Sequence, residues 1–470
     1  MNRFDLTSTY TDLYQLTMGQ VHYLNNHHEH DAVFDYFFRK LPYKGGYAIF
    51  AGLQDLLETL ETWTFLPSEL DYLKKIGLND SFVNSLDGFR FKGSIHSVKE
   101  GEVVFPQVPS IRVEGTMLET QLIETLLLNL INFQTLVATK AARIRQVASG
   151  KILADFGLRR AQGLGGYHAS RSTAVGGFQS TSNVKAAMDF GLQPSGTMAH
   201  AFVQHYEDEL TAFRVFAKGR PEGCVLLVDT YDTLKSGVPN AIIVAKEMEQ
   251  RGQRLDAIRL DSGDLAYLAT QSRKMLDDAG LKYVKIAASN QLDEFVIKSL
   301  MEQDAQIDIF GVGTSLVTGQ PDAALDGVYK LSFSDGKPRI KLSETLSKTT
   351  LPHKKQVFRL IDSNGNFWGG DAITLHDETS LVMMHHPTEP NKSTALQGLT
   401  LEKLLHPVMK DGKRIGAAPS IAEIAAYTLQ RLAQLPREYK RFENPHIYKV
   451  GISINLKTLR DDLRNKFLGR

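Results

Sequence analysis

The feature that most constrains the fold is a rhythm of short apolar runs in the middle of the chain. Each run is followed by a polar or glycine-rich cluster. Five such runs, rich in β-favouring residues, lie at 152–156, 225–228, 257–260, 284–288 and 307–310. The last three begin 27 and 23 residues apart, about the length of one strand–helix unit. Continuous apolar strands of this kind are typical of parallel sheets that are covered on both faces.

Segments with helical spacing separate most of these runs, at 241–250, 265–279 and 293–302. The alternation of strands and helices predicts an α/β fold of the barrel type. In such a barrel the chemistry lies at the carboxyl ends of the strands, where this chain places its polar and glycine-rich clusters.

The two ends of the chain differ from its centre. Near the amino terminus we expect helices, including a helical hairpin through 53–76 and a long helix from about 119 to 148, with a strand-like patch between them. Later, 334–337 and 362–365 carry the turn residues of β-hairpins. Apolar spacing predicts a further helix over 421–435, which ends before a proline.

A chain of 470 residues is long enough for about three domains, or for one large barrel with additions. We predict an N-terminal α+β segment over 1–150, a barrel with the active site over 151–330, and a C-terminal segment of strands and helices over 331–470. The first and last segments are expected to pack together as additional structure built from both ends of the chain.

Composition excludes several classes of function. There are 54 basic and 53 acidic residues, so bulk charge cannot drive binding to nucleic acid or to an anionic membrane. A single cysteine, Cys224, excludes an internal disulfide and suits a reducing compartment. The longest apolar stretch, 122–133, is short for a membrane span, and the first residues have no apolar core of a signal peptide. We therefore expect a cytoplasmic enzyme.

The most informative string is 258–264, where an arginine and two acids flank a serine and a glycine at the end of an apolar strand. Asp261 and its neighbours could accept hydrogen bonds from sugar hydroxyls or hold Mg²⁺ beside phosphate oxygens. The alternative is an ordinary turn in which Asp264 caps the helix that begins at Leu265. Similar turns after the neighbouring strands favour a binding site.

Two further strand ends carry binding chemistry. Gly311, Gly313 and Thr314 follow the last apolar run, and glycines allow backbone N–H groups to converge on an anion. Phe156 could stack on a flat substrate, while the following arginines, 159–160, could hold a carboxylate or phosphate. The alternatives are a tight turn without a ligand, and a core phenylalanine beside surface arginines.

Common nucleotide-binding signatures are not found. No P-loop string is present, and glycines 163–166 lack the spacing of a dinucleotide fingerprint. Residues 228–233 place an acid pair after an apolar run, as the phosphoribosyl-diphosphate loop of type I phosphoribosyltransferases does. Thr230 stands where that loop has a second acid, so the type I assignment is weak.

The histidines fall into two groups. Those at 27–30 and 385–386 lie on polar stretches and are expected to be solvated. His200 follows Gly196 and Thr197, which we expect to begin a helix with His200 one turn in and the acids 207–209 further along it. An imidazole held by a carboxylate could act as a base, or as a nucleophile that accepts phosphate. Both roles stay open at this point.

Six strings together resemble the nicotinate phosphoribosyltransferase family, and they occur in the family's order. They lie at 11–18, 155–163, 196–200, 228–233, 259–264 and 310–314. The resemblance implies a type II phosphoribosyltransferase fold, an irregular α/β barrel with an open-faced α+β sandwich domain, assembled as a homodimer. It also implies the condensation of nicotinate with 5-phosphoribosyl 1-diphosphate to nicotinate mononucleotide and diphosphate, coupled to ATP hydrolysis, in NAD salvage.

The resemblance assigns a role to each matching residue. The residues implied to contact nicotinate are Phe156, Tyr14 of the partner subunit, Arg159, Thr197, Arg259 and Ser182. Those implied for the phosphoribose and diphosphate are Ser262, Gly263, Asn290, Gly311, Gly313 and Thr314. Asp229 and Asp261 are implied to lie near Mg²⁺ and the ribose hydroxyls, with Asp261 also catalytic. His200 corresponds to the histidine that ATP phosphorylates.

Four other functions are less compatible with the sequence. The nicotinamide-specific relative shares the fold but has an acid near the carboxamide, whereas 177–183 has none and Ser182 stands near that place. Quinolinate phosphoribosyltransferase is shorter and needs more basic residues. Lys285 could form a Schiff base in a phosphosugar aldolase barrel. A non-catalytic ligand-binding homologue is disfavoured because the site strings are intact.

Overall fold

The computed structural model describes residues 6–343, 349–389 and 391–469. The chain divides into two units, and we call residues 137–323 the central unit. The flanking unit combines residues 1–136 with 324–470, so both ends of the chain form one unit. The finer division at residues 150 and 330 stays a prediction.

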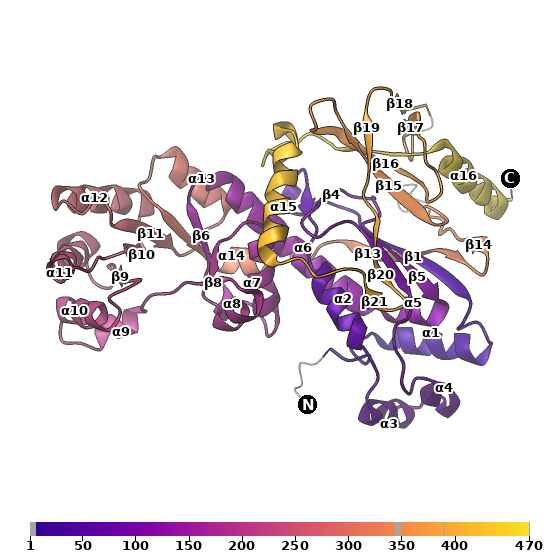
Figure 1. Cartoon of the computed structure of the whole chain (residues 1–470), viewed down its shortest axis with the longest axis horizontal. Coiled ribbons are helices and arrows are strands. Elements are labelled where there is room, and N and C mark those ends of the chain that lie inside the picture. The colour runs from indigo at the N-terminus through magenta and orange to yellow at the C-terminus, as the bar shows by residue number, and fades with distance from the viewer. Residues whose placement is uncertain (1–5, 344–348, 390, 470) are drawn as a thin grey trace. The chain divides into compact units, whose positions relative to one another are not determined.

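The central unit is built on a parallel sheet of seven strands in the order β8-β7-β6-β12-β11-β10-β9. Figure 1 labels β6, β8, β9, β10 and β11 of this sheet. Every neighbouring pair is parallel. The end strands β8 and β9 do not pair with each other within the described part of the chain, so the sheet is a half-barrel. The strands are β6 (Ile152–Asp155), β7 (Ser180–Thr181), β8 (Gln193–Pro194), β9 (Val225–Leu227), β10 (Ala257–Leu260), β11 (Lys285–Ser289) and β12 (Ile309–Val312).

All five predicted runs are strands, displaced by no more than two residues. The α/β fold class is therefore confirmed. The sequence analysis missed β7 and β8, because two-residue strands are too short to give a periodic pattern.

Helices follow the strands of the central unit. They are α7 (Gly165–Val175), α8 (Val184–Phe190), α9 (His200–Gln204), α10 (Glu209–Gly219), α11 (Val238–Gln250), α12 (Leu265–Asp278), α13 (Glu294–Glu302) and α14 (Thr314–Val317). The predicted cap of α12 is confirmed, since the Asp264 carboxylate accepts a hydrogen bond from the Tyr267 backbone N–H. Asp293 caps α13 in the same way. These caps fix where the chain turns from each strand end into the next helix.

The flanking unit contains two larger sheets. The first has the order β14-β13-β1-β5-β3-β20-β21 and the second the order β18-β17-β22-β16-β15-β19. The first comprises β1 (Asp31–Phe38), β3 (Ser94–Ser97), β5 (Ile111–Thr116), β13 (Gly327–Ser334), β14 (Lys337–Pro338), β20 (His406–Lys410) and β21 (Lys413–Arg414). The second comprises β15 (Lys355–Ile361), β16 (Phe367–Leu375), β17 (Met383–His385), β18 (Ser393–Ala395), β19 (Thr400–Lys403) and β22 (Lys449–Ile452). The strands β2 (Ala48–Ile49) and β4 (Val103–Val104) pair separately.

Both predicted hairpins form in these sheets. Asp335 and Gly336 adopt φ of 53° and 66° between β13 and β14, as a tight hairpin turn requires. Residues 362–365 connect β15 to β16, and Gly365 has φ of 80°. Strand β1 was not predicted; it is buried along nearly its whole length, and Asp35 interrupts its apolar residues, so it shows neither an alternating pattern nor a continuous apolar run.

Helices of the flanking unit are α1 (Leu13–Leu24), α2 (Leu53–Thr62), α3 (Pro67–Lys75), α4 (Asp80–Ser85), α15 (Ile421–Gln434) and α16 (Ile454–Leu468). The helical hairpin and the helix over 421–435 are confirmed, whereas α16 was not predicted. The single long helix expected over 119–148 is instead α5 (Met117–Leu122) followed by α6 (Glu124–Val147). Thr116 and Glu119 form a capping box that begins α5 early. No helix among the described residues has the length and apolarity to cross a bilayer.

Candidate active site

A cavity of about 280 Å³ lies at the carboxyl ends of β6, β10, β11 and β12. Its lining residues are Phe156, Arg159, Arg160, Arg259, Asp261, Ser289, Asn290, Gln291, Gly311, Gly313 and Thr314. Nine of them were predicted from the sequence: eight lie in the strings 155–163, 259–264 and 310–314, and the ninth is Asn290, after the run at 284–288. The half-barrel therefore brings these side chains together, because the carboxyl ends of parallel strands meet at one edge of the sheet.

The loop that carries Phe156 is held by a buried carboxylate. Asp155 is fully buried, and its Oδ1 accepts a hydrogen bond of 2.8 Å from the Gly157 N–H. Its Oδ2 accepts from the hydroxyls of Ser170 at 2.7 Å and Thr181 at 2.8 Å. Burial raises the pKa of Asp155, although these hydrogen bonds partly oppose the shift. The sequence analysis gave Asp155 no role, and its place directly before the aromatic residue was the only indication.

The ring of Phe156 packs closely on the next strand. A Cβ atom added at Gly311 would lie 2.4 Å from two carbons of this ring, well inside van der Waals contact. Glycine is therefore required at position 311 for space rather than for backbone conformation, and it sets how deep the ring can sit.

A cation lies beside the ring. The Arg259 guanidinium carbon is 5.6 Å from the centre of the Phe156 ring. Its Nε donates to Ser289 Oγ at 2.8 Å, and its terminal nitrogen donates to Asp261 Oδ1 at 2.8 Å. Ser289 in turn donates a short hydrogen bond to the same carboxylate oxygen. This linking role of Ser289 was not predicted from the sequence.

The same contacts control the charge of Asp261. Burial alone would raise its pKa, but the hydrogen bonds from Ser289 and Arg259 and the positive charge of Arg259 outweigh burial and lower it. Asp261 is therefore an anion at neutral pH, next to a fixed cation.

His200 faces two carboxylates from neighbouring strand ends. Its Nε2 lies 3.9 Å from Asp229 Oδ1 and 3.9 Å from Asp261 Oδ2. Its Nδ1 lies 3.2 Å from the Thr230 hydroxyl. The expectation of a helix that carries His200 one turn in and also the acids 207–209 is wrong. Helix α9 begins at His200 and ends at Gln204, so the nearby acids come from β9 and β10 instead.

Asp229 is buried with one oxygen unsatisfied. Its Oδ2 accepts from the Asp261 N–H at 3.0 Å and from the Ser262 hydroxyl. Its Oδ1 has no hydrogen-bond partner among the described residues. A buried carboxylate oxygen without a donor is expected to meet a ligand, an ion or water.

This arrangement fits Mg²⁺ bound mainly through a substrate. Mg²⁺ prefers oxygen ligands and often takes only one or two carboxylates from the protein, with phosphates and water completing the shell. Asp229 and Asp261 could supply those carboxylates. No group of three or more His, Cys, Asp or Glu side chains suited to a metal occurs within the described ranges, so the protein alone does not form a complete cage.

Two features of the cavity suit anions. Arg159 and Arg160 are exposed, and neither forms an ion pair among the residues that the structure describes. Asn290 and Gln291 adopt left-handed φ values of 82° and 49°, which turn the backbone sharply after β11. Such turns are common where backbone groups line a ligand site.

Five predicted residues, besides Asp229 and His200, do not line this cavity. The Thr197 hydroxyl donates to the Val225 carbonyl, and the Ser182 N–H donates to the Asp155 carbonyl at 2.8 Å. Ser262 and Gly263 form the turn after β10, where Gly263 has φ of 76°. Tyr14 belongs to α1 of the flanking unit and is 46% exposed.

The geometry offers no support for a Schiff-base aldolase. Lys285 is the first residue of β11, and it is exposed. The cavity residue Ser289 is the last residue of the same strand, and Asn290 follows it. Lys285 therefore lies at the opposite end of β11 from the cavity at the carboxyl ends of the strands.

Comparison with known proteins gives matches over almost the whole chain. The profile described as the nicotinate phosphoribosyltransferase (NAPRTase) family matches residues 152–387. Profiles for the N-terminal and C-terminal domains of nicotinate phosphoribosyltransferase match residues 9–132 and 354–460.

Individual relatives agree with these profiles. A nicotinate phosphoribosyltransferase of Bacillus subtilis is 44% identical over 96% of this chain and 93% of its own length. One from Dictyostelium discoideum is 38% identical over 98% and 88%. The crystal structure of human nicotinic acid phosphoribosyltransferase superimposes with a TM-score of 0.86 at 30% identity, covering 97% of this chain and 99% of that one.

Proposed function

The chain belongs to the nicotinate phosphoribosyltransferase family, and we propose that its half-barrel cavity is where the bond between nicotinate and ribose forms. The enzyme condenses nicotinate with 5-phosphoribosyl 1-diphosphate to nicotinate mononucleotide and diphosphate, a step of NAD salvage. One observation supports this location above the others: an aromatic ring, a cation and anion-binding turns line one cavity.

Phe156 would stack on the pyridine ring, and Arg259 and Arg159 would attract its carboxylate. A guanidinium suits a carboxylate because it can donate two parallel hydrogen bonds. Stacking would hold the ring nitrogen in line with the anomeric carbon of the ribose. Thr197 and Ser182 would lie at the edge of this base site. Because residues 177–183 include no acid, a carboxylate meets no repulsion there, which favours nicotinate over nicotinamide.

The phosphoribosyl group would bind along the neighbouring turns. Asn290, Gly311, Gly313 and Thr314 would contact its 5-phosphate, and Ser262 and Gly263 would face the diphosphate. Asp261 would accept hydrogen bonds from the ribose hydroxyls and stabilise the positive charge that develops on the ribose as diphosphate leaves. Bound Mg²⁺, held by Asp229 and Asp261, would neutralise part of the diphosphate charge.

We propose that His200 accepts a phosphoryl group from ATP: an imidazole nitrogen attacks the γ-phosphorus, ADP leaves, and water later cleaves the nitrogen–phosphorus bond to release phosphate. Its Nε2 is equally distant from two carboxylates, so a phosphoryl group of about two negative charges at this position would repel both of them. The Asp229 carboxylate also holds the turn after β10, because it accepts hydrogen bonds from the Asp261 N–H and the Ser262 hydroxyl. Repulsion would move that turn, and this movement would couple ATP hydrolysis to ribosyl transfer.

We further propose a homodimer in which Tyr14 of the partner subunit covers the second face of the pyridine ring. Besides Tyr14, helix α1 leaves Leu13, Met18, Val21 and Leu24 exposed. Tyr14, Met18 and Val21 are four and three residues apart, so they share one face of the helix, and an exposed apolar face suits an interface. The single cysteine, Cys224, agrees with a cytoplasmic location.

Product analysis tests the proposed function. Purified protein is incubated with 5-phosphoribosyl 1-diphosphate, Mg²⁺ and either nicotinate or nicotinamide, with and without ATP. We expect nicotinate mononucleotide in the first case, more of it with ATP, and little nicotinamide mononucleotide in the second. Equal or greater use of nicotinamide would contradict the assigned base site, and failure of ATP to raise the yield would contradict the coupling.

A further inference from the structure

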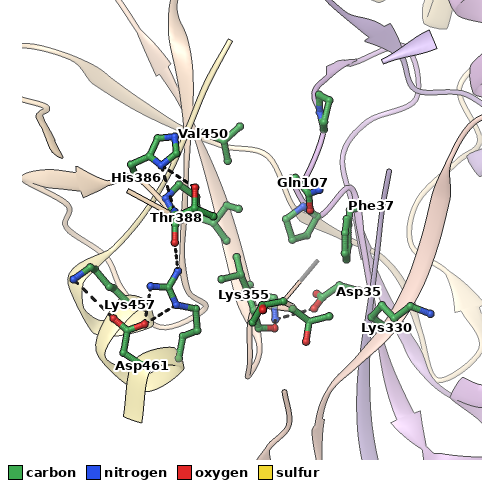
Figure 2. Close-up of a pocket in the computed structure, with 18 of the residues that line it drawn as sticks. Asp35, Phe37, Gln107, Lys330, Lys355, His386, Thr388, Val450, Lys457 and Asp461 are labelled. Atoms are coloured by element: carbon green, nitrogen blue, oxygen red, sulfur yellow. Dashed lines mark hydrogen bonds and ion pairs between the residues drawn. The ribbon is translucent and has the colours of Figure 1, made fainter. Parts of the chain in front are cut away.

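A second cavity, of about 540 Å³, lies entirely within the flanking unit, between its two larger sheets (Figure 2). Strands β1, β13, β15, β16 and β22 contribute to its walls, together with helix α16. Its volume falls within the range of about 300–1,000 Å³ typical of small-molecule sites. None of its lining residues belongs to the half-barrel site.

One wall of this cavity is cationic. Lys457, Arg460 and Arg464 are three and four residues apart on α16, so they share one face of the helix and line the cavity together. Asp461 forms ion pairs with Arg460 at 2.7 Å and Lys457 at 3.8 Å. Arg464 has no hydrogen bond or ion pair within the described part of the chain. The wall therefore carries three positive charges and one negative charge, and the Arg464 guanidinium is the cation without a partner among the described residues.

The opposite wall combines apolar surface with a buried ion pair. Phe37 supplies apolar surface on this side, and Ile373 and Val450 supply more from the second sheet. Asp35 and Lys355, 3% and 1% exposed, form an ion pair of 2.7 Å. Figure 2 draws Asp35 and Phe37 on one side of the space and Lys457 and Asp461 on the other, with Lys355 between them.

One carboxylate oxygen of Asp35 has no hydrogen-bond donor among the described residues. This oxygen, Oδ1, is buried, although Asp35 lines the cavity. Leaving a buried carboxylate oxygen without a donor is costly, so such a group is expected to receive a donor from a molecule that enters the cavity. The Arg464 guanidinium can donate hydrogen bonds to an anionic group of the same molecule.

We propose that this cavity is a binding site for a nucleoside monophosphate, separate from the half-barrel site. The phosphate lies against Arg464 and the other cations of α16. A hydroxyl of the sugar donates to Asp35 Oδ1, and the flat base lies on Phe37 and its apolar neighbours. Inorganic phosphate alone would satisfy the cations and leave Asp35 and the apolar wall without a partner, so the three features together require a larger, amphipathic anion.

Calorimetric titration with AMP tests this site. We expect saturable binding that weakens by at least about tenfold in Arg464→Gln, the factor expected when a charge-assisted hydrogen bond is lost. Lys466→Gln is the matched control, because Lys466 lies on the same helix, is exposed and does not line the cavity. Adenosine and inorganic phosphate, titrated separately, should each bind at least about tenfold more weakly than AMP.

Photolabelling locates the bound probe. Irradiation with 8-azido-AMP followed by peptide mapping should mark segments that contain Phe37 or Val450, and Arg464→Gln should remove that mark. Label confined to residues 137–323 would place the probe in the half-barrel site and overturn the proposal. Absence of saturable binding, equal binding of AMP and inorganic phosphate, or equal binding by the wild-type protein and Arg464→Gln would also overturn it.

Discussion

Replacing Gly311 by alanine should weaken the binding of nicotinate, and it should do so only by displacing the Phe156 ring. The added Cβ would lie 2.4 Å from the ring carbons Cδ2 and Cε2, whereas ordinary contacts begin near 3.4 Å. The ring must therefore move by about 1 Å, or the strand must shift, at a cost of about 1–3 kcal/mol. Because Phe156 is proposed to stack on nicotinate, we expect kcat/KM for nicotinate to fall about 10- to 100-fold. Most of that change should appear in KM for nicotinate.

Steady-state kinetics over a range of nicotinate concentrations measure the effect. Gly219→Ala is the control, since a Cβ at that position meets no atom within 4 Å. The decisive comparison is a double-mutant cycle with Phe156→Ala. Once the ring is gone, the alanine at 311 has nothing to displace, so it should cost little more activity. An unchanged KM in Gly311→Ala, or an equal loss with and without the Phe156 ring, would refute the reasoning.

The remaining predictions concern charge. His200→Ala should lose both the acid-labile label taken from γ-labelled ATP and the stimulation of activity by ATP, while the control His205→Ala keeps both. If His200→Ala instead lowered the rate of ribosyl transfer by about 10²–10⁴ equally with and without ATP, His200 would be a general base. Ser182→Asp should weaken use of nicotinate by about 1–3 kcal/mol, because a carboxylate would face the substrate carboxylate, and unchanged nicotinate kinetics would exclude Ser182 from the base site. Burial and nearby cations lower the pKa of His96 to about 4, so the folded protein keeps this imidazole neutral while the unfolded chain protonates it near pH 6.5. Stability should therefore fall as the pH drops from about 6.5 to 4, by up to about 3 kcal/mol, and urea titrations should show this loss reduced in His96→Gln but not in His27→Gln.

The sequence predicted the central unit well because its signals are local. Each strand of β9 to β12 is a continuous apolar run that ends in polar or glycine-rich residues, and Asp264 caps its helix as its position indicates. The flanking unit was harder to predict. Strand β1 pairs with β13, almost 300 residues later in the chain, and no pattern within a short segment indicates so distant a partner.

In the candidate site, too, local features could be predicted from the sequence and long-range contacts could not. Motifs at the strand ends identified Phe156, Arg259 and Asp261, because each lies where a parallel sheet places its binding residues. The links between strands could not be predicted, since they depend on register. Ser289 joins Arg259 to Asp261 only because β10 and β11 pair with Arg259 opposite Ala287.

The division of the flanking unit between both ends of the chain has a consequence for synthesis on the ribosome. Strand β1 lies between β5 and β13, so one of its edges stays open until residues 137–323 have been made. At about 5–20 residues per second, that interval lasts about 10 to 40 seconds. Throughout it, a nascent chain exposes the unpaired edge of β1 while the half-barrel is still being made. We expect the cell's holding chaperones to act on this protein at its first 136 residues, and we expect expression at lower temperature, which slows aggregation, to raise the soluble yield.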